Sequence, residues 1–268
     1  MGKLNYETIN VEVQGAIAVA KINRSDAANA LNLQMLKDFK KLCDDMRTEV
    51  DIDIIIITGE GKHFCAGADI SRECRDHNWY LDPQPNERLY QRHGQDTLHA
   101  LENLDQITIA AVNGVAMGWG LGVCTACDIR IAADNASFSV PEAKLGFIYS
   151  IGATSSLINA VGPTHAKWLI FTGERIRAQR ALEIGLVSKI VPVDKLMEET
   201  MNWAYEIDKA DFGSLRINKK IINAETLAKM YDICIVEPEL VHGSVHLHAQ
   251  EEGMAAFREK REPHFPRD

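Results

Sequence analysis

Residues 52–58 read IDIIIIT, and this short run decides the expected fold. Four consecutive isoleucines leave no polar face, which is typical of a strand buried on both sides in a parallel sheet. Upstream, residues 9–13 and 16–22 are rich in β-branched side chains and predict two further strands. Before the isoleucine run, apolar residues recur at helical spacing, namely Leu31, Met35, Leu36, Phe39, Leu42, Cys43 and Met46. A strand, a helix and a strand in this order predict a parallel α/β sheet.

The same alternation continues along the chain. We expect a helix over 87–104, a strand over 108–113, a helix after Gly118, a strand over 129–133 and a short strand near Phe138. Beyond Gly173 the pattern becomes mostly helical, with candidate helices over 178–184, 194–209 and 225–261. The sequence therefore predicts an α/β core over residues 1–195 and a C-terminal helical region over residues 196–268.

The amino-acid composition limits the classes of partner that the protein is expected to bind. The chain has 268 residues, with 29 Lys plus Arg against 38 Asp plus Glu, and the resulting net charge of -9 argues against nucleic acid. The N-terminus carries no apolar leader and cysteines are sparse, so we expect reduced thiols and a cytoplasmic location. Residues 107–127 are uncharged over a length that could span a bilayer. Because this segment holds Asn113 and four glycines between acidic flanks, we expect a buried strand, loop and helix and no membrane contact.

Two glycine-rich turns follow neighbouring strands of the predicted sheet. CAGADI (65–70) comes after the isoleucine strand, and NGVAMGWGLG (113–122) comes after the next one. Small residues let a ligand approach backbone N–H groups, and a helix N-terminus favours developing negative charge. Two such turns can place two N–H donors around one oxygen. The alternative is a pair of tight strand-to-helix turns that bind nothing.

No cofactor or metal is expected. Gly118-Trp119-Gly120 is not a dinucleotide fingerprint because its third glycine would fall on Val123, and no phosphate-binding lysine follows it. Four residues have the side chains of zinc ligands, but a gap of eight residues between the two pairs leaves a cramped loop: His63, Cys65, Cys74 and His77.

Several segments carry a resemblance when taken in order. NRSDAANAL (23–31), HFCAGADI (63–70), AAVNGVAMGWGLG (110–122), FSVPEAKLGF (138–147) and EEGMAAFREKR (251–261) resemble the enoyl-CoA hydratase/isomerase (crotonase) superfamily across nearly the whole chain. The resemblance implies a crotonase-like (ClpP/crotonase) α/β fold of repeated ββα units with C-terminal helices that form a homotrimer or homohexamer. It also implies an acyl-CoA thioester as substrate, coenzyme A as part of that substrate, and a thioester enolate as intermediate.

The resemblance implies a catalytic machinery too. The N–H groups of Ala66 and Trp119 would hold the enolate oxygen, with Trp119 standing where the family usually has glycine. Hydratases of the family use two glutamates, and here their positions hold Gly122 and Glu142. Glu142 alone implies a proton shuttle, so we expect a double-bond isomerase or a non-standard hydratase or lyase. A standard 2-enoyl-CoA hydratase and an inactive CoA-thioester-binding homologue are the alternatives.

Contacts with substrate and CoA are expected from small residues around the two turns and from the C-terminal helix. The residues that the resemblance implies are Ala27, Ala28, Ala66, Ala68, Asp69, Ile70, Gly118 and Ser150, with Phe257 and Lys260 reaching the CoA of a neighbouring subunit. The loop over residues 77–85 is expected to line the acyl pocket.

Overall fold

The structure is a computed structural model that describes residues 5–71, 86–227 and 249–263. The loop over residues 77–85 and most of the expected helix over 225–261 thus lie outside the described residues. The strands are β1 (Ile9–Gln14), β2 (Ile17–Ile22), β3 (Ile54–Gly59), β4 (Ile107–Val112), β5 (Val115–Met117), β6 (Ile129–Ala133), β7 (Ser137–Ser139), β8 (Ile176–Arg177) and β9 (Lys189–Val191). The α-helices are α1 (Leu33–Met46), α3 (Asn86–Glu102), α4 (Trp119–Ala126), α5 (Ala153–Thr172), α6 (Ala178–Glu183), α7 (Leu196–Asp208), α8 (Phe212–Leu227) and α10 (Ala249–Glu259). Short 3-10 helices are η1 (Ser25–Ala27), η2 (Glu142–Leu145) and η3 (Val193–Lys195).

The main sheet has the order β1-β2-β3-β4-β6-β9. The first pair is antiparallel, and every later neighbour pairs in parallel, which confirms the predicted parallel sheet. A second sheet of order β5-β7-β8 stands beside it. In parallel sheets the carboxyl ends of the strands share one edge, so the turns that follow β3 and β4 emerge next to each other.

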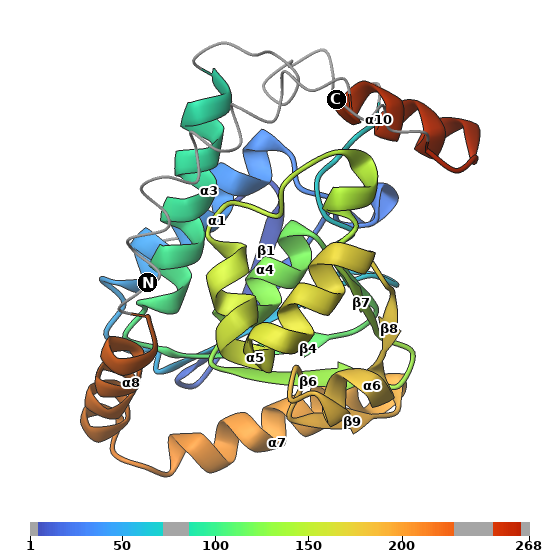
Figure 1. Cartoon of the computed structure of the whole chain (residues 1–268). Coiled ribbons are helices and arrows are strands. Elements are labelled where there is room, and N and C mark those ends of the chain that lie inside the picture. The colour runs from blue at the N-terminus through green and yellow to red at the C-terminus, as the bar shows by residue number, and fades with distance from the viewer. Residues whose placement is uncertain (1–4, 72–85, 228–248, 264–268) are drawn as a thin grey trace.

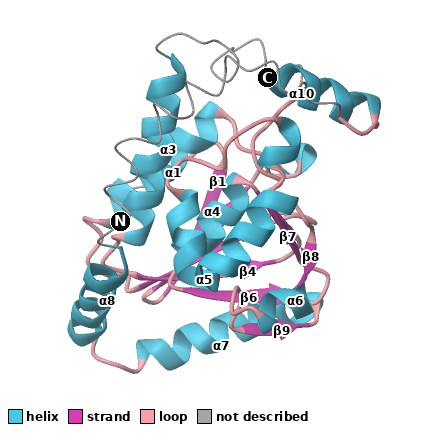
Figure 2. Cartoon of the chain, in the orientation of Figure 1, coloured by secondary structure: helices cyan, strands magenta, loops and turns pink. Residues whose placement is uncertain are grey.

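Helices cover both faces of the main sheet (Figure 1, Figure 2). Ile55 and Ile57 face the larger core with α1, α4 and α5. Ile54 and Ile56 face the smaller core between the sheet and α7. The isoleucine run is thus buried on both faces, as predicted. Although α7 begins in the region expected to form the C-terminal extension, it packs on β3, β4 and β6 and so completes the core.

Two helices were not expected from the sequence, namely α8 and the longer α5. Helix α5 is interrupted at Gly162, which has non-helical φ 74° and precedes Pro163. Its first half is buried against α4, so its residues are apolar or small around much of the helix and show no single stripe. Of the helices that the structure describes, none is long and apolar enough to cross a membrane, and the uncharged stretch folds as β4, β5 and α4.

Candidate active site

The two glycine-rich turns lie against each other. The N–H of Cys65 donates to the carbonyl oxygen of Val115 (2.9 Å), and that of Met117 donates back to Cys65 (3.0 Å). Gly67 has φ +93° and Gly118 has φ +50°, conformations that favour glycine. A Cβ on Gly67 would lie 3.1 Å from the Met117 oxygen and 3.8 Å from Gly118 Cα. The contact therefore depends on the absence of side chains at both positions.

The direction of the N–H groups in the first turn differs from the prediction. Ala66 donates its N–H to the carbonyl oxygen of Ala28 (3.1 Å), so this donor is not free for a substrate oxygen. Leu31 instead bonds to both neighbours of Ala68, donating to Gly67 (2.7 Å) and accepting from Asp69 (2.9 Å). Successive N–H groups of an extended segment point to opposite sides, so that of Ala68 points away from Leu31. It has no acceptor within the described part of the chain.

Trp119 is the first residue of α4. Its N–H is therefore one of the groups that a helix N-terminus leaves without an intrahelical partner. The indole is buried and meets the Phe39 ring edge-on, with centroids 5.2 Å apart and planes at 79°. The bulky side chain thus occupies the core beside α1.

Glu142 begins η2 directly after Pro141 and lies next to the second turn. A Cβ on Gly118 would be 2.5 Å from its Oε1. Its Oε2 is buried and has no hydrogen-bond partner among the described residues. Burial raises the pKa of Glu142 from its ordinary value to about 7, since the charged form loses hydration. The carboxyl is therefore suited both to take and to return a proton near neutral pH.

No second carboxyl group fits at Gly122. A Cβ there would lie 2.9 Å from the Cβ of Ala153 on α5 and 3.2 Å from Leu98 Cδ1 on α3. This position is therefore filled by neighbouring apolar side chains.

The residues expected to contact CoA differ in where they lie relative to the two turns. Ala27 and Ala28 lie in and after η1, and Ala28 borders the first turn through its bond with Ala66. Asp69 forms an ion pair with Arg24 (2.9 Å) and accepts from the N–H of Ser71 (3.1 Å), so its carboxylate stabilises the turn. Ile70, which follows it, is half-buried.

The remaining predicted contacts come from two later segments. Ser150 is half-buried and its carbonyl oxygen accepts from Ala153 (3.2 Å). Helix α10 packs on η2, where a Cβ on Gly253 would lie 2.5 Å from the Leu145 carbonyl carbon. Phe257 and Lys260 are exposed near the end of α10, and their contact with a neighbouring subunit stays a prediction.

Two asparagines to which the sequence assigned no role in the site hold the loop after β3. The side-chain amide of Asn29 donates to the carbonyls of Glu60 (2.9 Å) and His63 (2.7 Å). That of Asn113 donates to Gly59 (2.9 Å) and Gly61 (3.0 Å). Asn113 directly precedes a glycine at a strand end, and this was the available sequence signal.

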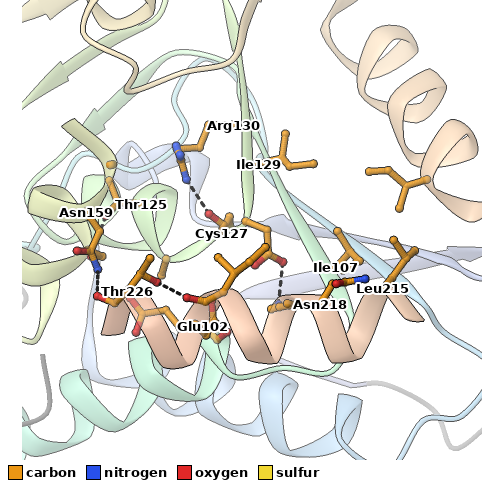
Figure 3. Close-up of a pocket in the computed structure, with 18 residues that line it drawn as sticks. Glu102, Ile107, Thr125, Cys127, Ile129, Arg130, Asn159, Leu215, Asn218 and Thr226 are labelled. Atoms are coloured by element: carbon orange, nitrogen blue, oxygen red, sulfur yellow. Dashed lines mark hydrogen bonds and ion pairs between the residues drawn. The ribbon is translucent and has the colours of Figure 1, made fainter. Parts of the chain in front are cut away.

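A separate cavity of about 440 Å³ lies between α8, the end of α4 and α5 (Figure 3). Its polar groups are mostly paired within the protein. Lys219 bonds to Asp128 (2.7 Å) and to the Gln106 carbonyl (2.8 Å), and Asn159 donates to Thr226 (3.1 Å). The Glu102 carboxyl also lines the cavity, and its buried Oε2 has no hydrogen-bond partner among the described residues.

Comparisons with known proteins identify the family of the chain and its fold. The family model described as enoyl-CoA hydratase/isomerase matches residues 12–268. A probable enoyl-CoA hydratase of Mycobacterium bovis is 36% identical over 262 residues, covering 98% of this chain and 99% of the relative. A short-chain-enoyl-CoA hydratase of Clostridium acetobutylicum is 36% identical, covering 96% and 97%. The crystal structure of an enoyl-CoA hydratase/isomerase from Xanthobacter autotrophicus superimposes with a TM-score of 0.86 at 27% identity, covering 95% and 94%.

The chain belongs to the enoyl-CoA hydratase/isomerase family, and its fold is the crotonase fold of these proteins.

Proposed function

We propose that this protein acts on an acyl-CoA thioester through an enolate, with Glu142 as its single acid/base carboxyl group. The observation that carries the proposal is the Glu142 carboxyl, which is buried and unpartnered at Oε2 beside the Gly118 turn. A pKa of about 7 keeps both protonation states populated at neutral pH. Such a group can remove a proton from one carbon and deliver it to another.

The N–H groups of Ala68 and Trp119 are the proposed donors to the thioester oxygen. Both follow a glycine of positive φ in turns that lie against each other, and Trp119 adds the N-terminal end of α4. Negative charge appears on the thioester oxygen as the enolate forms, so donors fixed in advance lower the barrier. Removing one such donor typically costs about 3–4 kcal/mol of transition-state stabilisation.

We favour double-bond isomerisation, or a non-standard hydratase or lyase reaction, over standard 2-enoyl-CoA hydration. The packing of Ala153 and Leu98 around Gly122 supports this choice because it excludes a second carboxylate at that position. A standard hydratase is the main alternative, and the names of the relatives from Mycobacterium bovis and Clostridium acetobutylicum favour it. Hydration would then need a different group to position the water.

Incubation with 2-enoyl-, 3-enoyl- and aryl-propenoyl-CoA thioesters in deuterated water, read by mass spectrometry, separates these reactions. Deuterium uptake or a moved double bond without added water supports the lone proton shuttle. Addition of water to the acyl chain supports a hydratase. The control is Glu142→Gln, which is expected to bind CoA thioesters with unchanged affinity and to give neither product. Turnover that survives this substitution would contradict the proposal, and a wild type that binds but converts no thioester would favour an inactive binding homologue.

We also propose that copies of the chain associate through the C-terminal helices. Ile217, Ile221 and Ile222 of α8 are 55%, 58% and 60% exposed, which is an unusual amount of apolar surface for one helix face. Light scattering after size-exclusion chromatography should give the mass of a trimer or hexamer, and a monomer would refute this part.

A further inference from the structure

Tyr149 contacts the second turn at Gly118 and is almost fully buried. Its hydroxyl donates to the carbonyl oxygen of Gly118 at 3.4 Å. The same oxygen accepts the N–H of Gly122 at 3.1 Å, within the first turn of α4. Two donors therefore converge on the Gly118 carbonyl, one from the helix and one from the tyrosine.

That carbonyl shares its peptide unit with the N–H of Trp119. The C=O of Gly118 and the N–H of Trp119 are the two ends of one planar amide, and they point in opposite directions. The Trp119 N–H is the proposed second donor to the enolate oxygen. A hydrogen bond at the carbonyl end of an amide polarises its N–H end, because hydrogen bonds in a chain strengthen one another. A donor to the Gly118 carbonyl oxygen therefore strengthens the Trp119 N–H as a donor to the enolate oxygen.

The segment that carries Tyr149 is held in place from two sides. The hydroxyl of Thr154, at the start of α5, donates to the Tyr149 carbonyl at 2.6 Å. Ile151 has φ +64°, a left-handed conformation that is strained for a β-branched residue. Its Cγ2 fills the space that a Cβ on Gly94 of α3 would occupy, which glycine leaves open. Strain of this kind persists where the surrounding structure fixes the backbone, often close to a functional site.

We propose that Tyr149 is a positioning residue for the reaction, which polarises and orients the Gly118–Trp119 peptide so that its N–H stabilises the enolate oxygen. This inference rests on the proposed function. The bond of 3.4 Å is long, as is common for hydrogen bonds that tighten when charge develops in the transition state. The hydroxyl proton stays on Tyr149 throughout, and no bond to it forms or breaks.

The first test is Tyr149→Phe, which removes the hydroxyl and keeps the ring. We expect kcat to fall about three- to tenfold, the size of one hydrogen bond, while KM changes by less than about twofold. Tyr205→Phe is the matched control, because the Tyr205 hydroxyl accepts from Gln14 (2.6 Å) at the surface of α7. It should leave both constants unchanged.

A spectroscopic readout separates polarisation from simple packing. An aryl-propenoyl-CoA thioester absorbs at longer wavelength when its carbonyl is polarised, and Glu142→Gln prevents turnover during the measurement. In this background, Tyr149→Phe should reduce the red shift of the bound thioester without weakening its binding. Should Tyr149→Phe fail to fold, Thr154→Val releases the same segment and is expected to reduce the shift in the same direction.

A kcat within about twofold of wild type together with an unchanged red shift would overturn the role of Tyr149 while the proposed function stands. Equal losses in kcat and in substrate binding with no spectral change would also overturn it, since that pattern indicates packing alone. A wild type that neither converts nor polarises any thioester would refute the proposed function and this inference with it.

Discussion

The Glu142 carboxyl occupies the space that a side chain on Gly118 would need, because a Cβ there would lie 2.5 Å from Oε1. Gly118 also has φ +50° and ψ −121°, a conformation that L side chains rarely adopt. One glycine therefore satisfies two requirements, the direction of the turn and the position of the acid/base group.

Gly118→Ala should remove most activity because both requirements fail. Displacing the carboxyl and the adjacent N–H by about an ångström is expected to lower kcat about a hundredfold. Backbone strain should lower the free energy of unfolding by about 1–3 kcal/mol. Gly15→Ala is the control, since Gly15 also has positive φ but nothing within 4 Å of the added Cβ. It should lose stability but keep kcat, and equal losses of activity in both variants would contradict the special role of Gly118.

The pH profile should report the Glu142 carboxyl. Burial raises the pKa of Glu142 to about 7, so the base form needed to remove a proton is lost as the pH falls through that value. We expect kcat/KM to decrease about tenfold per pH unit below neutrality and to reach a plateau above it. Steady-state rates between pH 5 and 9 in a constant-ionic-strength buffer test this. An acidic limb near the ordinary glutamate value would show that the carboxyl is hydrated in the working enzyme.

The main sheet was predictable because its central strand is a run of isoleucines that no helix or turn pattern fits. The resemblance predicts Glu142 near the second turn, because it stands in a Pro-Glu pair at a fixed distance from that turn, and its carboxyl does lie against Gly118. Its acid/base role stays a prediction. The direction of the N–H groups was not predictable, since Ala66 and Ala68 have the same side chain, and the positive φ of Gly67 between them turns their N–H groups in different directions. Helix α5 was not predicted because its first half is buried and so shows no single apolar stripe. The hydrogen bond between Tyr149 and Gly118 was not predicted because it joins residues 31 positions apart.

Glu102 should make the protein less stable as the pH rises. This residue is 5% exposed, and burial raises its pKa to about 8, while Lys219 opposes and Asp128 reinforces the shift. The folded state then holds a proton that the unfolded state loses above the ordinary glutamate pKa, so stability falls through the interval up to about pH 8. Glu102→Gln keeps the shape but removes the titration. When the pH is raised from 6 to 9, the Tm of this variant should fall less than the Tm of wild type, by roughly a few degrees. Thermal unfolding at the two pH values measures this.

Glu142 titrates in the same direction, so the comparison is made between Glu102→Gln and wild type at each pH, with Glu142 present in both. The difference in free energy of unfolding between the two proteins should change with pH by roughly a few kcal/mol. A constant difference from pH 6 to pH 9 would mean that Glu102 is ionised and paired in the folded protein at neutral pH.

A second carboxylate can be introduced when the neighbour that excludes it is removed. Gly122→Glu alone places its Cβ 2.9 Å from Ala153 Cβ, and such overpacking is expected to cost about 1–3 kcal/mol of stability. Combining it with Ala153→Gly removes that contact and leaves Leu98, whose Cδ1 is the end of a flexible side chain, to adjust.

Two carboxylates suit the addition of water, because one activates the nucleophile while the other handles the α-proton. The double variant should therefore add water to a 2-enoyl-CoA at least about tenfold faster than wild type. Gly122→Gln with Ala153→Gly has the same bulk without the charge and should show no gain. The hydration rate is measured by mass spectrometry of the acyl chain under identical conditions. Equal hydration by the Glu and Gln variants would mean that space near Gly122, rather than a second acid/base group, limits the reaction.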